Sequence, residues 1–527
     1  MCGIFAVLGG SDDFVTDALV KRLFQKGQHR GPDHTMFSRD AHFALGFHRL
    51  AINGLSETSQ QPLQRNKLSL ICNGEIYNYK KLATLLSLNM KTESDCEVIL
   101  HLYEKYGMHH TLELLDGVFS FVLIDRELDM AWIARDPYGV RPLFYGKHGE
   151  AFVFASEMKM MLANDIKQFQ PGSVSQYVVD PLTSVYTCTI SEEHYFSGYH
   201  ISPEIVDKDA AVIAVHAAVC TAVAKRVKCT DKPIACLLSG GLDSSIIAAV
   251  VSKYSKTPLH TYSIGLSHSE DLGYARIVAS HIGSVHHEVI VSEDDFFNAI
   301  PAVIEGIESY DTTTVRASVG NYLIGKYIKE HSNAKVIFNG DGADEVAGGY
   351  LYFDNAPNAY EYDKECKRLL KSIHFFDVLR SDRAMALHGL EARTPFLDKA
   401  FVRTYLSIPA TIRFHPGNNA PGKYLIRKAF ASYLPPAIVS RRKEAFSDGV
   451  SGLQRSWFQI IQEKVSTLSI DRHIETYSHN SPSTLEQHYY RSLFEKTYPN
   501  CATAIPYFWM PKYTEASDAS ARTLAIY

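Results

Sequence analysis

The sequence predicts a two-part protein, an α+β region of stacked sheets followed by an α/β region built on a parallel sheet. Three observations indicate this fold class. The chain has 527 residues, which is long for a single hydrophobic core. Roughly the first 190 residues are rich in short β-like runs, and from about residue 205 apolar strands alternate with helical patterns. Such alternation favours right-handed β-α-β units and therefore a parallel sheet.

In the first region, many candidate strands and few helices predict stacked sheets with some covering helices. The clearest helical pattern is SDCEVILHLYEKYG, which is apolar at a spacing of three and four residues. The strand-like runs are IFAVLG, HFALGFHRLAI, LSLICNGEI, GVFSFVLIDR, MAWIARD, PLFYG and AFVFASE.

In the second region, the apolar strand PIACLL is followed by a glycine turn and the helix DSSIIAAVVSKY. LHTYSIGL, a helix near 271–282, HHEVIV and the helix FFNAIPAVIEGI then repeat the alternation. After Asn339 the chain is predicted to be mostly helical. We expect the boundary within 197–210, giving two domains at 1–195 and 205–527.

Composition predicts a cytoplasmic globular protein without a nucleic-acid partner. Hydrophobic residues make up 46% and charged residues 21%, which are ordinary values for a globular protein. The net charge of −5 gives no indication of the basic patch by which nucleic-acid-binding domains are usually recognised. Nine cysteines form no C-x-x-C pair and no His/Cys cluster, which disfavours a zinc site or a disulfide framework. No signal peptide is visible, and we expect the apolar stretch from Ala210, interrupted by His216 and Thr221, to fall short of a membrane span.

The most informative stretch is ACLLSGGLDSS, residues 235–245, which predicts a strand, a tight turn and a helix start. Its glycines let backbone N–H groups approach an anion at the positive end of the helix, and its serines add hydroxyl donors. Asp243 supplies a carboxylate for a Mg²⁺ ion that accompanies phosphate. The alternative is a plain turn with an N-cap serine. The candidate phosphate-binding residues are Ser239, Gly240, Gly241, Ser244 and Ser245.

A second candidate loop, VIFNGDGADEVAGGYLYF at 336–353, again runs from an apolar strand into glycines and carboxylates. Alone it could be a surface turn, but paired with the first loop it predicts the other half of one Mg–ATP site, with Asn339 and Gly340 at the nucleotide. Carboxylates repel a triphosphate unless a metal lies between them, so Asp243 and Asp344 are the candidate metal ligands. Charge-assisted donors to the leaving pyrophosphate are expected from Lys443, beside Arg442, and from Thr313, Thr314 and Arg316.

The first loop is not a Walker A motif, because G-x-x-x-x-G-K-[ST] is absent from the chain. It resembles instead the S-G-G-x-D-S loop of the ATP pyrophosphatases, which split ATP between its α- and β-phosphates and form acyl-adenylates. This resemblance implies a doubly wound parallel sheet with added helices. It also implies that Leu237 and Ile264 hold the adenine.

The N-terminal motifs point to a second family. MCGIF, HRGPD at 29–33, GFHRLAI at 46–52, NGEIYN at 73–78 and TESDCE at 92–97 resemble those of the class II, N-terminal-nucleophile (Ntn) glutamine amidotransferases. This resemblance implies an αββα stacked-sheet sandwich. With HGLEARTPFLD at 388–398 and MPKYTEASDASARTL at 510–524, the whole chain resembles the family of glutamine-hydrolysing asparagine synthetases.

The resemblance makes Cys2 the nucleophile of a glutaminase, rather than only the start of a buried strand. A thiol on the first residue has its own α-amino group as a base, with an ordinary pKa of about 7.7–8.0. Cys2 would attack the glutamine amide to give a thioester and ammonia, which requires removal of Met1. Asn73 and Gly74 are implied as the oxyanion hole. The implied glutamine-binding residues are Arg49, Leu50, Ala51, Ile52, Asn53, Asn73, Gly74, Glu75 and Asp95.

Two of these residues also have structural interpretations. Arg49 would grip the α-carboxylate of glutamine, but it could be a surface cation. Glu75 and Asp95 would hold the ammonium group, but Asp95 could be the N-cap of the following helix.

The resemblance implies ATP-dependent synthesis of asparagine: aspartate is adenylated at its β-carboxylate, and ammonia displaces AMP. ATP and Mg²⁺ are the implied cofactors, the partners are small-molecule substrates, and the implied assembly is a homodimer. Asp341, Lys443 and Arg316 are the implied catalytic residues of this half. Alternatives are a ligase that amidates or cyclises another carboxylate, as in β-lactam synthetases, which generally lack the N-terminal cysteine, and a non-enzymatic nitrogen sensor.

The sequence departs from the family pattern at the second loop. It has N-G-D-G-A-D-E where the family most often has S-G-E-G-S/A-D-E. Asn339 therefore replaces a serine, and Asp341 replaces a glutamate that is implied to help deprotonate the attacking ammonia. Losing one methylene shortens the reach of this carboxylate by about 1.5 Å.

Overall fold

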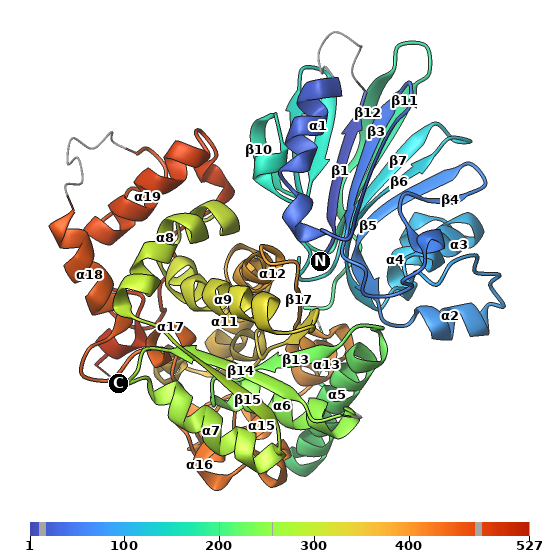
Figure 1. Ribbon diagram of the computed structural model, residues 1–527. Helices are drawn as coiled ribbons and strands as arrows, with labels where there is room; N and C mark the ends of the chain where they lie inside the picture. The colour runs from blue at the N-terminus through green and yellow to red at the C-terminus, as the bar shows by residue number, and fades with distance from the viewer. Residues whose placement is uncertain (10–16, 200, 256, 469–476, 526) are drawn as a thin grey trace. The chain divides into compact units, whose positions relative to one another are not determined.

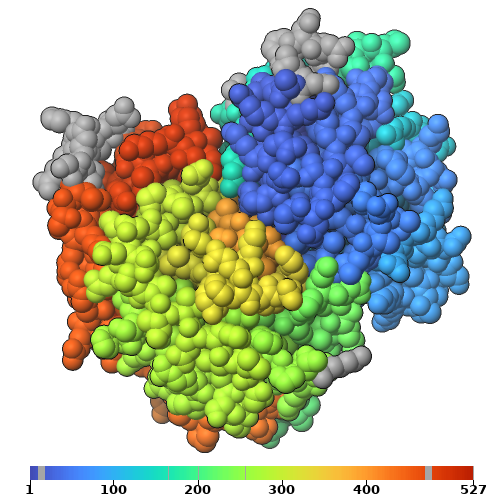
Figure 2. Space-filling model, viewed as in Figure 1, coloured from blue at the N-terminus to red at the C-terminus, as the bar shows by residue number. Residues whose placement is uncertain are grey.

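The computed structural model describes residues 1–9, 17–199, 201–255, 257–468, 477–525 and 527. His200, within the expected boundary, lies outside the described residues. The chain divides into two compact units (Figure 1). In Figure 2 the blue and cyan atoms belong mainly to the N-terminal unit and the green to red atoms mainly to the C-terminal unit. The N-terminal unit comprises Met1–Ser197, Cys229–Lys232 and Ala386–Glu391, and the C-terminal unit comprises Gly198–Lys228, Pro233–Met385 and Ala392–Tyr527.

The N-terminal unit contains two six-stranded antiparallel sheets. The first sheet has the order β10 (Asn164–Gln168), β8 (Phe144–His148), β9 (Ala151–Ala155), β1 (Gly3–Leu8), β3 (Phe43–Arg49) and β2 (His34–Arg39). The second has the order β12 (Val185–His194), β11 (Ser173–Asp180), β7 (Met130–Arg135), β6 (Gly117–Asp125), β5 (Leu68–Ile76) and β4 (Leu63–Arg65).

Alternation of side chains along the strands places one core between these sheets and another outside them. Ile4 and Phe47 of the first sheet share a cluster with Ile71 of the second. On the other face of β5, Leu70 packs with Ile99. The predicted αββα sandwich is therefore confirmed. The covering helices are α1 (Asp17–Gln25) on the first sheet, and α2 (Tyr79–Leu85), α3 (Glu97–Tyr106) and α4 (Met108–Leu114) on the second.

The strands that the sequence analysis missed include the edge strands β2 and β12. Their residues are mostly half-buried or exposed, because an edge strand contacts a neighbour on one side only. Polar side chains at a sheet edge also discourage pairing with other chains. Such strands lack the apolar run by which the inner strands were found.

The C-terminal unit is built on a five-stranded sheet in which β13 pairs in parallel with β14 and with β16, and β14 pairs in parallel with β15. Strand order runs outward from β13 in both directions, which confirms the predicted doubly wound sheet. The order is β15 (Val285–Ile290), β14 (His260–Gly265), β13 (Ile234–Leu237), β16 (Val336–Phe338) and β17 (Glu391–Arg393). The connecting helices are α6 (Leu242–Tyr254), α7 (Glu270–Ile282), α8 (Glu293–Ile307) and α9 (Thr312–His331).

The chain after β16 is mostly helical, as predicted. Its helices are α10 (Ala343–Ala347), α11 (Ala359–Ser372), α12 (Asp377–Ala386), α13 (Lys399–Leu406), α14 (Ala410–Arg413), α15 (Tyr424–Ala429), α16 (Pro436–Val439), α17 (Phe446–Gly449), α18 (Trp457–Thr467) and α19 (Leu485–Thr497).

Helix α5 (Lys208–Lys228) is the apolar stretch that was expected to fall short of a membrane span. By length and composition it is sufficient to cross a membrane, so that expectation is wrong on this criterion. His216 and Thr221 do not lower the mean hydropathy of this helix enough, because alanines and valines make up much of it. In the structure α5 packs against α6, α13 and α15, and Arg226 near its end pairs with Asp398 at 2.6 Å. These contacts are those of a helix within a folded unit.

A buried ion cluster in the N-terminal unit holds the start of β1. The carboxylate of Glu157 is fully buried and lies 2.8 Å from Arg30 Nη1, 3.0 Å from Lys159 Nζ and 3.1 Å from His29 Nε2. Arg30 Nε donates to the carbonyl oxygen of Cys2 at 2.9 Å. Although burial opposes ionisation, these cations hold the pKa of Glu157 well below its usual range.

We expect Glu157→Ala to lower the free energy of unfolding by about 3–5 kcal/mol, because it leaves Arg30 buried without its carboxylate. Since the folded pKa is depressed, this stabilisation is present above the ordinary value of about 4.3 and is lost as the pH falls towards the folded pKa. Urea unfolding at several pH values measures the difference. The exposed Glu113→Ala is the control and should change stability by less than about 0.5 kcal/mol. Equal midpoints for Glu157→Ala and the unmodified protein at pH 7 would contradict the prediction.

Candidate active sites

Cys2 lies immediately before β1, where both its backbone and its thiol have partners. Gly3 is paired with His48 across β1 and β3, which brings Cys2 beside the end of β3. Its Sγ donates to the carbonyl oxygen of Leu50 at 3.7 Å. Both β1 and β3 contact β5, the strand that carries Asn73, Gly74 and Glu75. The predicted nucleophile and the predicted oxyanion residues therefore come from contacting strands.

Burial determines the acid–base properties of the chain start. It lowers the pKa of the Met1 α-amino group to about 6, partly opposed by Glu391 and by Cys2. It also raises the pKa of the Cys2 thiol to about 11, against the effect of the nearby α-ammonium and the bond to Leu50. A thiol with such a pKa needs a base. The amine whose pKa burial lowers belongs to Met1, whereas the expected base is the α-amino group that Cys2 carries once Met1 is removed.

Asn73 and Gly74 form an unusual pair on β5. Asn73 is fully buried, and neither its Nδ2 nor its Oδ1 has a hydrogen-bond partner among the described residues. An unpaired buried amide costs free energy, which points to a ligand that completes its bonding. A Cβ at Gly74 would lie 2.6 Å from the carbonyl oxygen of Val118, so larger residues do not fit. This arrangement can accommodate an oxyanion.

Arg49 is buried, so its interpretation as a surface cation is wrong. Its guanidinium donates to the carbonyl oxygens of Ser56 at 3.1 Å and Asn53 at 3.5 Å, and also to that of Gly54. These bonds hold the loop that contains Leu50, Ala51, Ile52 and Asn53. Arg49 thus shapes the predicted glutamine-binding segment, a role that the motif did not indicate.

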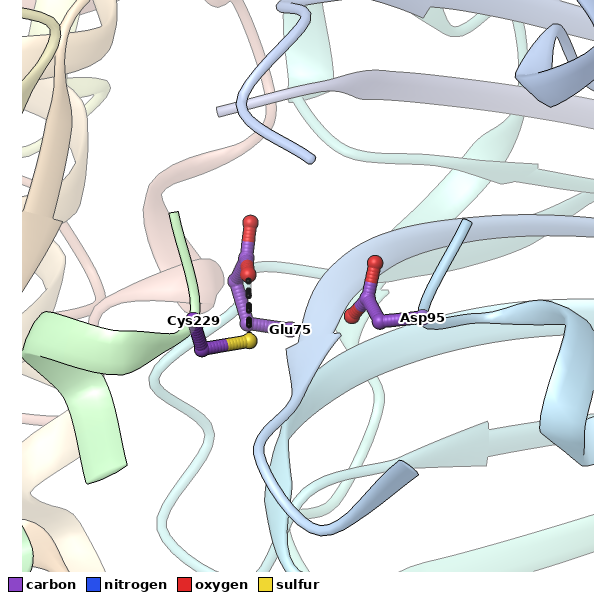
Figure 3. A group of neighbouring side chains, drawn as sticks. All are labelled: Glu75, Asp95 and Cys229. Atoms are coloured by element: carbon purple, nitrogen blue, oxygen red, sulfur yellow. Dashed lines mark hydrogen bonds between the residues drawn. The ribbon is translucent and has the colours of Figure 1, made fainter. Parts of the chain in front are cut away.

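Glu75, Asp95 and Cys229 form a buried cluster (Figure 3), and one ligand atom from each lies within 4.8 Å of the others. Glu75 Oε2 accepts from Asn53 Nδ2 at 2.5 Å and from Cys229 Sγ at 3.5 Å. Asp95 Oδ2 accepts from the Ile76 N–H at 2.6 Å. The N-cap interpretation of Asp95 is wrong, because the N-cap of α3 is the residue after it. Two buried carboxylates in this place favour a cationic group.

Cys229 belongs to a segment that the sequence analysis did not connect with this cluster. The segment lies between α5 and β13, and the Asp231 N–H donates to the carbonyl oxygen of Ile52 at 2.9 Å. Asp231 Oδ2 accepts from the Gly54 N–H at 3.0 Å. These bonds place Cys229 beside Glu75, although 154 positions separate them in the sequence.

In the C-terminal unit, the turn between β13 and α6 has the predicted form. Gly240 has φ +72°, and a Cβ there would lie 2.4 Å from Tyr274 Cβ, so this position requires glycine. Ser239 Oγ and Ser244 Oγ are 3.1 Å apart. Ser245 is buried within α6. The turn borders a cavity lined by Leu237, Ser239, Gly241, Asp243, Ser244, Ile264, Asn339, Gly340, Asp341, Asp344 and Lys443 of the predicted residues, but not by Gly240 or Ser245.

Two lysines neutralise the predicted metal-binding carboxylates. Lys423 Nζ lies 2.6 Å from both Asp243 Oδ2 and Asp344 Oδ1, and Lys443 Nζ lies 2.6 Å from Asp344 Oδ2. Although burial opposes ionisation, both ammonium groups hold the pKa of Asp344 well below its usual range. Asp243 Oδ1 is buried and has no hydrogen-bond partner among the described residues. Converging carboxylate oxygens, one of them unsatisfied, fit a hard cation such as Mg²⁺.

Asp341 is held by neighbours on both sides. Its Oδ2 accepts from Asn339 Nδ2 at 2.8 Å, and its Oδ1 accepts from Arg380 Nη2 at 3.0 Å. Burial raises the pKa of Asp341, with Arg380 opposing and Asp377 adding to the effect. A raised pKa suits a carboxylate that accepts a proton. Asn339, one of the two departures from the family pattern, therefore positions Asp341, which is the other.

The structure does not bring Arg316 to the cavity. Its guanidinium forms paired bonds with Glu486 at 2.6 and 2.8 Å and with Asp518 at 2.7 and 2.8 Å. The proposed bond from Arg316 to leaving phosphate is therefore not supported, because two carboxylates already take its donors. These partners lie 170 and 202 positions further along the chain, beyond what a local motif can show. Thr313 and Thr314 of the same motif do line the cavity.

Sequence reasoning missed several cations that line this cavity. Lys423 stands just before α15, outside any recognised motif, and no sequence signal marked it. Arg441 donates to Asp271 at 2.6 Å and to the carbonyl oxygen of Ser239 at 3.4 Å. The cationic residues of the lining are Arg380, Lys423, Arg427, Arg441, Arg442 and Lys443.

Comparison with known proteins gives two family matches and full-length relatives. Residues 1–201 match the model of the glutamine amidotransferase domain, and residues 214–367 and 356–505 match asparagine synthase. A solved structure of the glutamine phosphoribosylpyrophosphate amidotransferase from B. subtilis matches 55% of this chain and 91% of the chain in that structure. The sequence identity is 15% and the TM-score is 0.33, which is too low to support an inference about this chain.

The full-length relatives include asparagine synthetase [glutamine-hydrolyzing] from Gallus gallus, 41% identical over 562 residues, and the Homo sapiens protein of the same name, 40% identical over 569 residues. Each alignment covers 100% of this chain and 99% of the relative. These full-length matches show that the chain belongs to the glutamine-hydrolysing asparagine synthetase family.

Proposed function

We propose that this chain synthesises asparagine from aspartate in an ATP-dependent reaction, using ammonia released from glutamine at Cys2. The observation that carries the proposal is Cys2 itself. Its thiol is bonded to Leu50 at the end of β3, and β1 and β3 contact the strand of Asn73, a buried amide with no hydrogen-bond partner among the described residues. Full-length similarity to asparagine synthetases favours aspartate over another carboxylate as the acceptor.

In the glutaminase step, removal of Met1 places the α-amino group on Cys2. The amine takes the thiol proton, and the sulfur attacks the side-chain carboxamide carbon of glutamine. Asn73 Nδ2–H and the Gly74 N–H stabilise the resulting oxyanion. The intermediate collapses to a thioester and ammonia, and water then releases glutamate and restores the thiol.

Glutamine is a zwitterion, and the residues around Cys2 offer opposite charges for its two ends. Arg49 binds the α-carboxylate through donors not used on the loop, and Glu75 with Asp95 binds the ammonium. The loop Leu50, Ala51, Ile52 and Asn53, which Arg49 holds in place, forms the wall.

In the synthetase half, backbone N–H groups of the turn and the hydroxyl groups of Ser239 and Ser244 bind phosphate oxygens at the N-terminus of α6. Leu237 and Ile264 hold the adenine, and Asn339 and Gly340 complete the nucleotide site. Gly240 sets the shape of the turn, and Ser245 supports it from within α6.

Asp243 and Asp344 would hold Mg²⁺, which when bound would neutralise phosphate charge and favour departure of pyrophosphate. Lys443 and Lys423 stand beside these carboxylates, so they can turn to phosphate oxygens when ATP binds. The β-carboxylate of aspartate attacks the α-phosphorus of ATP, and pyrophosphate leaves. Asp341 then accepts a proton as ammonia displaces AMP from the aspartyl-adenylate.

We place the domains at 1–195 for the glutaminase and 205–527 for the synthetase. We also propose a cytoplasmic location, supported by cysteines that form no disulfide framework in the sequence, and a homodimer, supported by the family resemblance alone.

The reaction course has a direct isotopic test. Aspartate labelled with ¹⁸O in its β-carboxylate should transfer one labelled oxygen to AMP, because the β-carboxylate oxygen becomes the bridge of the adenylate. Mass spectrometry of the nucleotide products measures the label. ADP and phosphate as products, with no label in AMP, would exclude the adenylate route.

We expect Cys2→Ala to abolish asparagine synthesis from glutamine while synthesis from ammonium chloride continues. The substitution removes the nucleophile and leaves the C-terminal unit unaltered. Product assays with each nitrogen source measure both rates, and Cys188→Ala, a thiol elsewhere in the same unit, is the matched control. Intact mass should show that only chains lacking Met1 hydrolyse glutamine. Loss of ammonia-dependent synthesis in Cys2→Ala would contradict the separation of the two sites.

We expect Asp341→Asn to slow asparagine formation about 10²–10⁴-fold with either nitrogen source, the usual contribution of a general base. Adenylation precedes this proton transfer, so exchange of labelled pyrophosphate into ATP in the presence of aspartate should persist. Asn339→Ala should slow both asparagine formation and pyrophosphate exchange, because it frees one oxygen of Asp341 and removes a residue of the proposed nucleotide site. If pyrophosphate exchange fell as much as asparagine formation, Asp341 would act in nucleotide or aspartate binding instead.

A further inference from the structure

We propose that Glu75, Asp95 and Cys229 form a binding site for a zinc-like divalent ion, and that the ion excludes glutamine from its pocket. Metal binding stands on the geometry of these side chains alone. Only the competition with glutamine rests on the proposed function.

The three side chains already have the arrangement of an incomplete metal site. They are only 3–4% exposed, and Figure 3 shows the Cys229 sulfur directed at the Glu75 carboxylate with Asp95 nearby. Tetrahedral zinc with Zn–S near 2.3 Å and Zn–O near 2.0–2.2 Å requires ligand atoms about 3.3–3.6 Å apart. The distance from Cys229 Sγ to Glu75 Oε2 is 3.5 Å, and all three ligand atoms lie within 4.8 Å of one another. Small side-chain movements would close the site.

Asn73 is a second and independent indication of a ligand here. It lies two residues before Glu75 on β5, so both side chains project from the same face of the strand. It is fully buried, and its Oδ1 has no partner among the described residues.

The donor set selects the class of ion. Mg²⁺ and Ca²⁺ prefer oxygen ligands, whereas zinc combines thiolate with carboxylate. The Cys229 thiol must lose its proton to solvent on binding, so the affinity should rise with pH. Asn53 Nδ2, which lies 2.5 Å from Glu75 Oε2 and 3.4 Å from Cys229 Sγ, must turn away.

An ion at this site occupies the place proposed for the ammonium group of glutamine, because Glu75 and Asp95 serve both. Zinc should therefore raise the apparent KM for glutamine without lowering kcat. Synthesis from ammonium chloride uses the other unit and should not share this competition. Cys229, which the proposed glutaminase step does not use, distinguishes the metal site from the glutamine site.

Cobalt(II) is a suitable probe, added to the full chain carrying Cys2→Ala so that the nucleophile cannot supply the thiolate. We expect one ion per chain by equilibrium dialysis, and a thiolate-to-cobalt charge-transfer absorption that Zn²⁺ abolishes and excess Mg²⁺ does not. Adding Cys229→Ala should remove the absorption and weaken binding at least tenfold. The matched control, Cys188→Ala, should preserve both. Equal binding with and without Cys229, or an unchanged absorption, would overturn the site.

A second variant and an activity assay complete the test. Should Cys229→Ala fail to fold, Asp95→Asn must weaken cobalt binding at least tenfold while keeping the thiolate absorption, and unweakened binding would overturn the proposal. In the protein with Cys2 intact, zinc inhibition that glutamine cannot relieve would overturn the competition. Cobalt binding by the Cys2→Ala chain, together with no glutaminase activity in the chain that keeps Cys2 and has lost Met1, would support the metal site and contradict the proposed function.

Discussion

Arg30 joins the buried carboxylate of Glu157 to the backbone carbonyl of Cys2, and the proposed glutaminase depends on this connection. A chain terminus ordinarily frays, because few contacts restrain it. Here the first strand is internal to a six-stranded sheet, and the residue before it is tied to a buried ion pair and to the loop after β3. The same burial lowers the pKa of the Met1 α-amino group. One constraint therefore positions the thiol at the start of β1.

In the C-terminal unit, carboxylates line the cavity beside the turn between β13 and α6. The lining of this one cavity, which must accept a polyanion, includes six carboxylates, and four of them pair with cations of the same lining: Asp243, Asp341, Asp344 and Asp377. In the structure each has at least one cationic partner, Lys423, Lys443 or Arg380. These ion pairs keep the buried charges compensated, which matters because an uncompensated buried charge costs several kcal/mol. Binding of ATP with Mg²⁺ would then exchange partners: cations would turn to phosphate and carboxylates to metal.

Under the two proposals made for it, the cluster of Glu75, Asp95 and Cys229 serves two ligands with one charge pattern. Buried carboxylates attract any cation of suitable size, and the proximity of Cys229 adds a preference for ions that accept sulfur. The composition of the chain argued against a zinc site, because its cysteines form no ligand pattern along the sequence. Ligands brought together from distant segments leave no such pattern.

The sequence by itself determined the fold class, the family and the residues of two contiguous motifs. The order of strands and helices and the glycine turn after PIACLL follow local rules, since strand alternation, helix periodicity and positive φ depend on neighbouring residues.

Only the tertiary structure decided the polar partners. Lys423, Arg380 and Cys229 reach the sites from distant segments, and the edge strands β2 and β12 are defined by the sheet they join. Arg316 was predicted from its motif to reach the phosphate site, but ion pairs with Glu486 and Asp518 hold its side chain away from the cavity. Charge pairing acts through space, so its outcome depends on which remote segments the fold brings into contact.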